Sequence, residues 1–168
     1  MSAAAAIDAM STAEAEAALT RCCGSRRWVA AMVAQRPFGD DATMHRRADE
    51  AWAQVSRDDI LEAFDHHPRI GASLESLREK FASTATLSAG EQSGALGADE
   101  AVLTALRDGN LRYEQRFGHI FIVCATGKSA AQMLALLEAR MDNDPADELA
   151  VAAAEQLKIT HLRLDKLT

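Results

Sequence analysis

The chain has 168 residues, of which 48% are hydrophobic and 26% charged, a balance typical of a globular protein with one core. Its 25 acidic and 18 basic side chains give a net charge of −7, which argues against nucleic acid as the main partner because such proteins present a basic face. No apolar run reaches the roughly 18 residues that a membrane-spanning helix needs, and the N-terminus lacks the pattern of a secretory signal. Three cysteines, two of them adjacent, make a poor disulfide framework, so we expect free thiols in a cytoplasmic protein.

Four helical patterns follow one another in the first half of the chain, after residues 1–6, where we expect disorder. Ser11 and Glu14 have the spacing of a capping box, and Gly24 is a stop signal. Ser25 and Ser56 also precede periodic apolar residues, and Pro37 ends the second pattern. The stripes expected to be buried are Ala15, Ala18, Leu19 and Cys22; Trp28, Val29, Met32 and Val33; Met44, Ala48, Ala51, Trp52 and Val55; and Ile60, Leu61 and Phe64.

The fourth helical pattern runs into two adjacent histidines, His66 and His67, and is stopped there by Pro68. Extending its stripe from Ile60 and Phe64 places His67 on the buried face and His66 about a third of a turn away. Histidine is the side chain whose ordinary pKa lies closest to neutral pH, so it exchanges protons there. The pattern therefore favours His67 as the ring that faces a pocket.

The second half of the chain continues as helices separated by one polar segment. Leu74, Leu77 and Phe81 define a short helix, residues 83–97 are small and polar, and Asp99 opens a longer helix that Gly118 ends. Residues 119–125 are rich in β-branched and aromatic side chains, which indicates an extended segment or a buried helix start. Two further helices begin after Ser129 and at Pro145. The last has Leu149, Ala153, Leu157, Thr160, Leu164 and Leu167 along one face.

No internal repeat, linker or domain boundary is evident. The sequence predicts an all-α fold in which seven or eight short helices surround one core, with residues 1–168 as a single domain.

Three side chains are candidates for chemistry, and each has a structural alternative. His67 is either a catalytic acid or base or a core histidine satisfied by a hydrogen bond. Glu91 is either its partner or the third helical residue of a capping box that starts at Ser88. Arg163 borders the apolar stripe of the last helix, so it either binds a carboxylate or ureido group with its planar fork of donors or extends its charged end into water.

Metal and nucleotide chemistry find no support in the spacing of the residues. The available ligand types are at Asp65, His66, His67, His119, Cys124 and His161, and none of them has the spacing of a zinc site. A glycine-rich phosphate loop and a nucleophile elbow are both absent. We expect no metal and no organic cofactor.

Short motifs along nearly the whole chain nevertheless resemble one family, the decarboxylases of 2-oxo-4-hydroxy-4-carboxy-5-ureidoimidazoline (OHCU), which act in urate degradation. Each motif is short, and it is their number and order that make the resemblance specific. The motifs are Cys22-Cys23-Gly24-Ser25 with Trp28, Arg36-Pro37-Phe38, His67-Pro68-Arg69-Ile70-Gly71, Ser88-Ala89-Gly90-Glu91-Gln92, Asn110 with Tyr113, Phe117-Gly118-His119-Ile120-Phe121, Arg140 with Asn143 and Glu148, and Lys158-Ile159-Thr160-His161-Leu162-Arg163-Leu164.

The resemblance implies an all-helical homodimer that forms (S)-allantoin without a metal or cofactor. It implies that His67 is the proton donor and Glu91 its catalytic partner. The implied substrate-binding residues are Pro68, Ser88, Ala89, Gly90, Gln92, Phe121, Ile122, Val123, Cys124, Ala125 and Arg163.

Two other functions stay open at this point. In the first, the chain is a helical ligand-binding or interaction module in which His67, Glu91 and Arg163 are structural. In the second, it is a related enzyme that acts on another ureido acid. Convergence of the three side chains on one site would favour an enzyme over a module.

Overall fold

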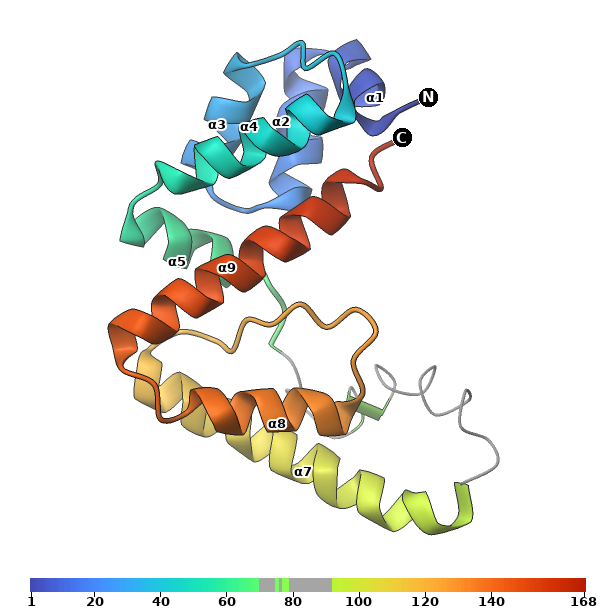
Figure 1. The fold of residues 1–168 in the computed structure, drawn as a ribbon, viewed down its shortest axis with the longest axis vertical. Coiled ribbons are helices and arrows are strands. Elements are labelled where there is room, and N and C mark those ends of the chain that lie inside the picture. The colour runs from blue at the N-terminus through green and yellow to red at the C-terminus, as the bar shows by residue number, and fades with distance from the viewer. Residues whose placement is uncertain (70–74, 76, 79–91) are drawn as a thin grey trace. The chain divides into compact units, whose positions relative to one another are not determined.

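The computed structural model describes residues 1–69, 75, 77, 78 and 92–168, and covers only the backbone of residues 92–99. Within these ranges the chain forms eight helices and no strand, which confirms the all-α prediction (Figure 1). The helices pack as two compact units, one of residues 1–67 and 153–168 and the other of residues 68–152. Each unit has its own cluster of buried apolar side chains. A single domain over the whole chain stays a prediction.

The first unit contains five helices that precede the histidine pair, together with the second part of the last helix. These helices are α1 (Ala3–Ala9), α2 (Thr12–Cys22), α3 (Arg26–Ala34), α4 (Asp41–Ala53) and α5 (Arg57–Asp65). The predicted capping box of Ser11 and Glu14 is present, and Ser25 and Ser56 cap α3 and α5 as expected. α3 packs against α2, α4 and α5, while α1 packs against α2 and α4.

Helix α1 corrects the expectation of disorder at residues 1–6. Ser2 caps it by accepting a hydrogen bond from the amide of Ala5, and Ile7 is fully buried. Alanine has the highest helix propensity, so a capped alanine run becomes helical once one of its faces packs. The run lacks contrast between apolar and polar residues, and a search for periodicity therefore misses it.

Most residues of the predicted stripes are buried in the core of this unit, whereas Val33, Val55, Ile60 and Leu61 are only half-buried. Ala15, Leu19, Trp28, Met32, Met44 and Phe64 have no exposed surface. Both tryptophans also satisfy their indole N–H groups, Trp28 on the carbonyl of Ala48 at 3.2 Å and Trp52 on that of Ala153 at 3.1 Å. The second bond fixes the last helix to α4.

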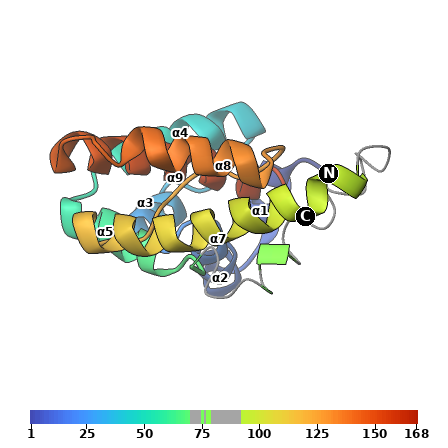
Figure 2. The same cartoon turned by 90° about the horizontal axis from the view of Figure 1, so that it is seen from below.

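The second unit is built on α7 (Gln92–Phe117) and α8 (Ala130–Arg140), which lie side by side (Figures 1 and 2). α8 has the predicted Ser129 cap, and α7 ends just before Gly118, whose φ of +77° suits glycine. The predicted start of α7 at Asp99 is wrong, because the helix begins at Gln92. Glycines 94 and 97 indicated a loop, yet a glycine costs a helix only about 1 kcal/mol and does not by itself end one.

The last helix, α9 (Pro145–Leu164), buries the predicted Thr160 and Leu164, but the rest of the predicted stripe is wrong. Leu149, Ala153 and Leu157 are only half-buried. The fully buried positions recur every four residues and include three polar side chains; they are Glu148, Ala152, Gln156, Thr160 and Leu164. The prediction followed the leucines, whereas the polar residues are buried because they have hydrogen-bond partners.

No helix in the described part of the chain is both long enough and apolar enough to cross a membrane.

Candidate functional site

The two histidines at the end of α5 differ in environment as predicted. His66 is the C-cap residue and is exposed, whereas His67 is half-buried. The amide of His67 donates to the carbonyl of Phe64 at 3.0 Å, which continues the helical turn up to the proline. The apolar stripe therefore identified the more buried ring correctly.

Gly24 provides the space that the end of α5 occupies. A Cβ atom at position 24 would lie 2.6 Å from the Cβ of His66 and 2.5 Å from its Cδ2. Rotating the imidazole would not relieve the first contact, because the Cβ position is set by the main chain. The motif Cys-Cys-Gly-Ser thus brings the main chain after α2 directly against the turn that carries His67.

His67 lies between two side chains of α9 in the same unit. Its Nε2 is 2.5 Å from Oε1 of Gln156, a fully buried amide. Its Nδ1 is 3.5 Å from Nη2 of Arg163. An imidazole beside a guanidinium combines a proton-transfer group with a cation that attracts a carboxylate, which is the pairing expected of a site for an acidic substrate.

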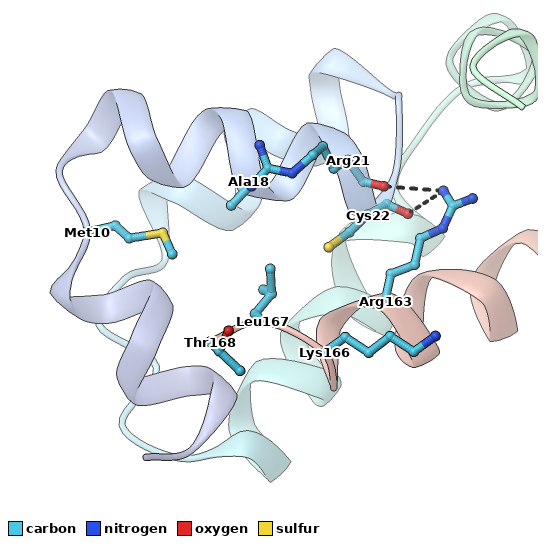
Figure 3. Close-up of a pocket in the computed structure, with 8 residues that line it drawn as sticks. All are labelled: Met10, Ala18, Arg21, Cys22, Arg163, Lys166, Leu167 and Thr168. Atoms are coloured by element: carbon cyan, nitrogen blue, oxygen red, sulfur yellow. Dashed lines mark hydrogen bonds between the residues drawn. The ribbon is translucent and has the colours of Figure 1, made fainter.

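The guanidinium of Arg163 is held by the main chain at the end of α2. Its Nη1 donates to the carbonyl of Arg21 at 3.3 Å and to that of Cys22 at 3.5 Å (Figure 3). Arg163 also lines an open depression of about 510 Å³, together with Arg21, Cys22 and Lys166. These contacts do not fit the alternative in which the charged end of Arg163 extends only into water.

The three cysteines are free and buried. Burial raises the pKa of Cys22 and of Cys23 to about 11. Neither thiol is therefore poised as a nucleophile at neutral pH.

We expect iodoacetamide at about pH 8 to modify Cys22 and Cys23 slowly in the native protein and rapidly after unfolding in guanidinium chloride. A pKa of about 11 leaves the unreactive thiol dominant at that pH, and unfolding returns both groups to their ordinary range. Mass spectrometry of timed samples measures the two rates. Fast native modification of either residue would show that its burial is wrongly described.

The predicted main-chain ligand segment, residues 121–125, belongs to the second unit and is neither helix nor strand. The predicted helix start at this segment is therefore not observed. Phe121, Ile122, Val123 and Cys124 are buried, and Ala125 is half-buried. Arg140 donates to the carbonyl of Ile122 at 2.8 Å, and Lys128 donates to that of Cys124 at 2.7 Å. These bonds fix the path of the segment.

A buried polar network stands behind this segment. Glu148 accepts hydrogen bonds from Tyr113 at 2.5 Å, from Nε of Arg140 at 2.7 Å and from Asn143 at 3.0 Å. The guanidinium of Arg140 also lies 4.5 Å from the centre of the Phe121 ring. Burial, and next the bond to Glu148, raise the pKa of Tyr113 well above its ordinary value.

The remaining predicted residues belong to the second unit or lie outside the described residues. Pro68 is exposed and begins the second unit. Ser88, Ala89, Gly90 and Glu91 lie outside the described residues, as does the side chain of Gln92, although its main chain begins α7. The convergence expected of His67, Glu91 and Arg163 is therefore observed for the first and third.

Sequence reasoning did not identify Gln156 as a neighbour of His67. The available signal was the four-residue spacing of Gln156 and Thr160, which continues to Leu164 on one face of α9. In the ranges that the structure describes, no three His, Cys, Asp or Glu side chains are grouped so that they could hold a metal ion.

Comparisons with known proteins agree on one family. The family model of OHCU decarboxylase matches residues 8–165. The uric acid degradation bifunctional protein TTL of Arabidopsis thaliana is 40% identical over 148 residues, which are 87% of this chain and 45% of that protein. The 2-oxo-4-hydroxy-4-carboxy-5-ureidoimidazoline decarboxylase of Amia calva is 38% identical over 58 residues, or 34% of this chain and 33% of that protein. The matched regions thus span less than half the length of these curated relatives.

A solved structure is similar over most of its length. The crystal structure of OHCU decarboxylase in the presence of (S)-allantoin superposes with a TM-score of 0.71 and 36% identity, covering 88% of this chain and 94% of that one.

Proposed function

Because the chain belongs to the OHCU decarboxylase family, we propose that it decarboxylates 2-oxo-4-hydroxy-4-carboxy-5-ureidoimidazoline to (S)-allantoin in urate degradation. The observation that carries the proposal is the pair of His67 and Arg163, with Nδ1 and Nη2 3.5 Å apart. An imidazole beside a guanidinium supports the proposal, because the substrate requires a proton donor and a cation that binds its carboxylate. A purely structural role for the two residues would not require a ring nitrogen to face a guanidinium.

The substrate makes a cofactor unnecessary. Its carboxylate is attached to a carbon next to a ring C=N bond, and that bond accepts the electron pair as carbon dioxide leaves. The protein then has to orient the ring, keep water from the carboxylate and supply one proton to one face of the ring. Arg163 suits the first task, since a planar guanidinium binds a carboxylate or a ureido group through two parallel hydrogen bonds.

His67 is proposed as the proton donor, and Glu91 as the carboxylate that favours its protonated form. The proposed substrate contacts are those of the family motifs: Pro68, Ser88, Ala89, Gly90, Gln92 and the segment Phe121, Ile122, Val123, Cys124 and Ala125. The hydrogen bonds from Arg140 and Lys128 support the proposed role of residues 121–125. These bonds fix the main chain of the segment, so that its amide and carbonyl groups are held in position for a ligand.

The proposed activity is tested by adding the purified protein to freshly generated OHCU. We expect the substrate absorbance to fall faster than in buffer, in proportion to the protein concentration. The general acid–base part of such catalysis is typically worth about 10² to 10⁴ in rate. Decay at the buffer rate, with protein shown to be folded by circular dichroism, would contradict the proposal.

A cytoplasmic homodimer is the assembly and location that we propose from the family resemblance. Light scattering coupled to gel filtration measures the mass in solution, and a chain mass of 18.1 kDa makes one copy and two easy to distinguish.

A further inference from the structure

The contact between His67 and Gln156 determines where the imidazole carries its proton. Gln156 is fully buried on α9, and its Oε1 lies 2.5 Å from Nε2 of His67. The amide nitrogen of Gln156 lies 3.1 Å from the hydroxyl of Thr160. That hydroxyl donates in turn to the main-chain carbonyl of Gln156 at 3.0 Å.

Taken together, these two bonds of the Thr160 hydroxyl favour one arrangement of hydrogens. Since the Thr160 hydroxyl donates its hydrogen to a carbonyl, its oxygen accepts from the neighbouring amide, and the NH₂ group of Gln156 must face Thr160. The carbonyl oxygen of that amide then faces His67, and a carbonyl oxygen only accepts. This arrangement assigns a hydrogen to Nε2 of His67.

The other ring nitrogen has the opposite role. Nδ1 is 3.5 Å from Nη2 of Arg163, and a guanidinium has only donors. A neutral ring with its hydrogen on Nε2 presents a lone pair at Nδ1, which matches a donor at that position. Both neighbours thus favour the same tautomer of His67.

We propose that Gln156 is a positioning residue that holds His67 as the Nε2–H tautomer, so that Nδ1 is the atom that exchanges the proton during turnover. The inference rests on the proposed decarboxylation. As the bond to the carboxylate breaks, its electron pair stays in the ring system and carbon dioxide leaves. The Nδ1 proton of the imidazolium forms the new C–H bond, and the neutral imidazole that remains recovers a proton from water.

A buried amide is well suited to this task. It accepts from Nε2–H in both the neutral and the protonated ring, so the orientation of the ring does not change through the cycle. An uncharged partner also avoids binding the imidazolium so strongly that it becomes a poor acid.

The experiment compares Gln156→Met, which removes the acceptor at similar volume, with Gln156→Glu, which keeps an acceptor oxygen. ¹⁵N NMR of histidine-labelled protein reports the tautomer at a pH where the ring is neutral, and the signals of His67 are those lost in His67→Ala. We expect the Nε2–H form in the unmodified protein, a mixture of tautomers in Gln156→Met and the Nε2–H form again in Gln156→Glu.

Kinetics provide the second measurement. We expect kcat of Gln156→Met to fall by about tenfold to a hundredfold with little change in KM, as for other residues that orient a functional histidine through its second nitrogen. Gln156→Glu should recover part of kcat, with a pH profile moved upward because its negative charge favours the imidazolium. Gln35→Met is the matched control, since Gln35 lies in the same unit and, among the described residues, its side-chain amide bonds only the carbonyl of Ala31, at 3.0 Å.

An Nδ1–H tautomer in the unmodified protein would overturn the inference, as would an unchanged tautomer and kcat in Gln156→Met. If Gln156→Met does not fold, Gln156→Glu decides by the same spectra and by the direction of its pH shift. The tautomer is measured without substrate, so lack of turnover by the unmodified protein would contradict the proposed activity and the role of Nδ1 in it, but not the tautomer that Gln156 holds.

Discussion

Replacing His67 with alanine is expected to lower the rate of OHCU decarboxylation by about 10² to 10⁴, the usual worth of a positioned general acid. The change removes the only ring that lies between Gln156 and Arg163 in the described residues, and the neighbouring His66 is exposed. The expected result is a fall in kcat with a smaller change in KM, since Arg163 remains to bind the anionic substrate. Progress curves at several substrate concentrations measure both.

His66→Ala is the matched control, because it removes the neighbouring imidazole from the same turn. It should retain most of the activity. In His67→Ala the buried Oε1 of Gln156 loses its hydrogen-bond partner, which lowers the stability of the protein. Thermal unfolding of both variants is therefore measured together with the kinetics. Equal losses of activity in two folded variants would contradict the assignment of His67 as the acid.

Glu148→Gln is expected to destabilise the second unit by about 3 to 5 kcal/mol, the usual cost of removing one partner from a buried ion pair. Glu148 is fully buried and lies 2.5 Å from Nη2 of Arg140, which is itself 7% exposed. The substitution leaves the guanidinium of Arg140 buried without a countercharge. Because whole domains are stable by only about 5 to 15 kcal/mol, the loss should be visible in urea unfolding curves.

The loss of stability in Glu148→Gln should be largest in one segment of the second unit. Arg140 holds the carbonyl of Ile122, so we expect faster amide hydrogen exchange at residues 121–125 in Glu148→Gln. Glu138→Gln, the same substitution on the exposed face of α8, should change stability by less than about 0.5 kcal/mol. Equal stability of the two variants would mean that the buried network does not support this segment.

Patterns of apolar residues predicted most of the helices and the half-buried position of His67. The stripes from Ala15 to Phe64 repeat at helical intervals beside polar faces, and the serine caps mark where three of the helices begin. Such signals involve residues only a few positions apart, so they can be identified from the sequence alone. The same reasoning selected His67 over His66 from only two apolar residues of α5.

Polar burial was not predictable in this way. Glu148 and Gln156 are fully buried because partners distant in sequence, Tyr113 and His67, satisfy their hydrogen bonds. Intrinsic preferences place both residue types on the surface, and only the fold supplies their partners. The alanine-rich α1 and the glycine-containing start of α7 were missed for the related reason that packing outweighs local propensity.

The stereochemistry of the product tests the central claim most directly. Freshly generated OHCU is allowed to react to completion with the protein, and the enantiomers of allantoin are separated by chiral chromatography. A fixed acid that protonates one face predicts an excess of the (S) form, whereas spontaneous decay gives a racemate. Racemic allantoin from folded protein, formed at the rate seen in buffer, would contradict the account.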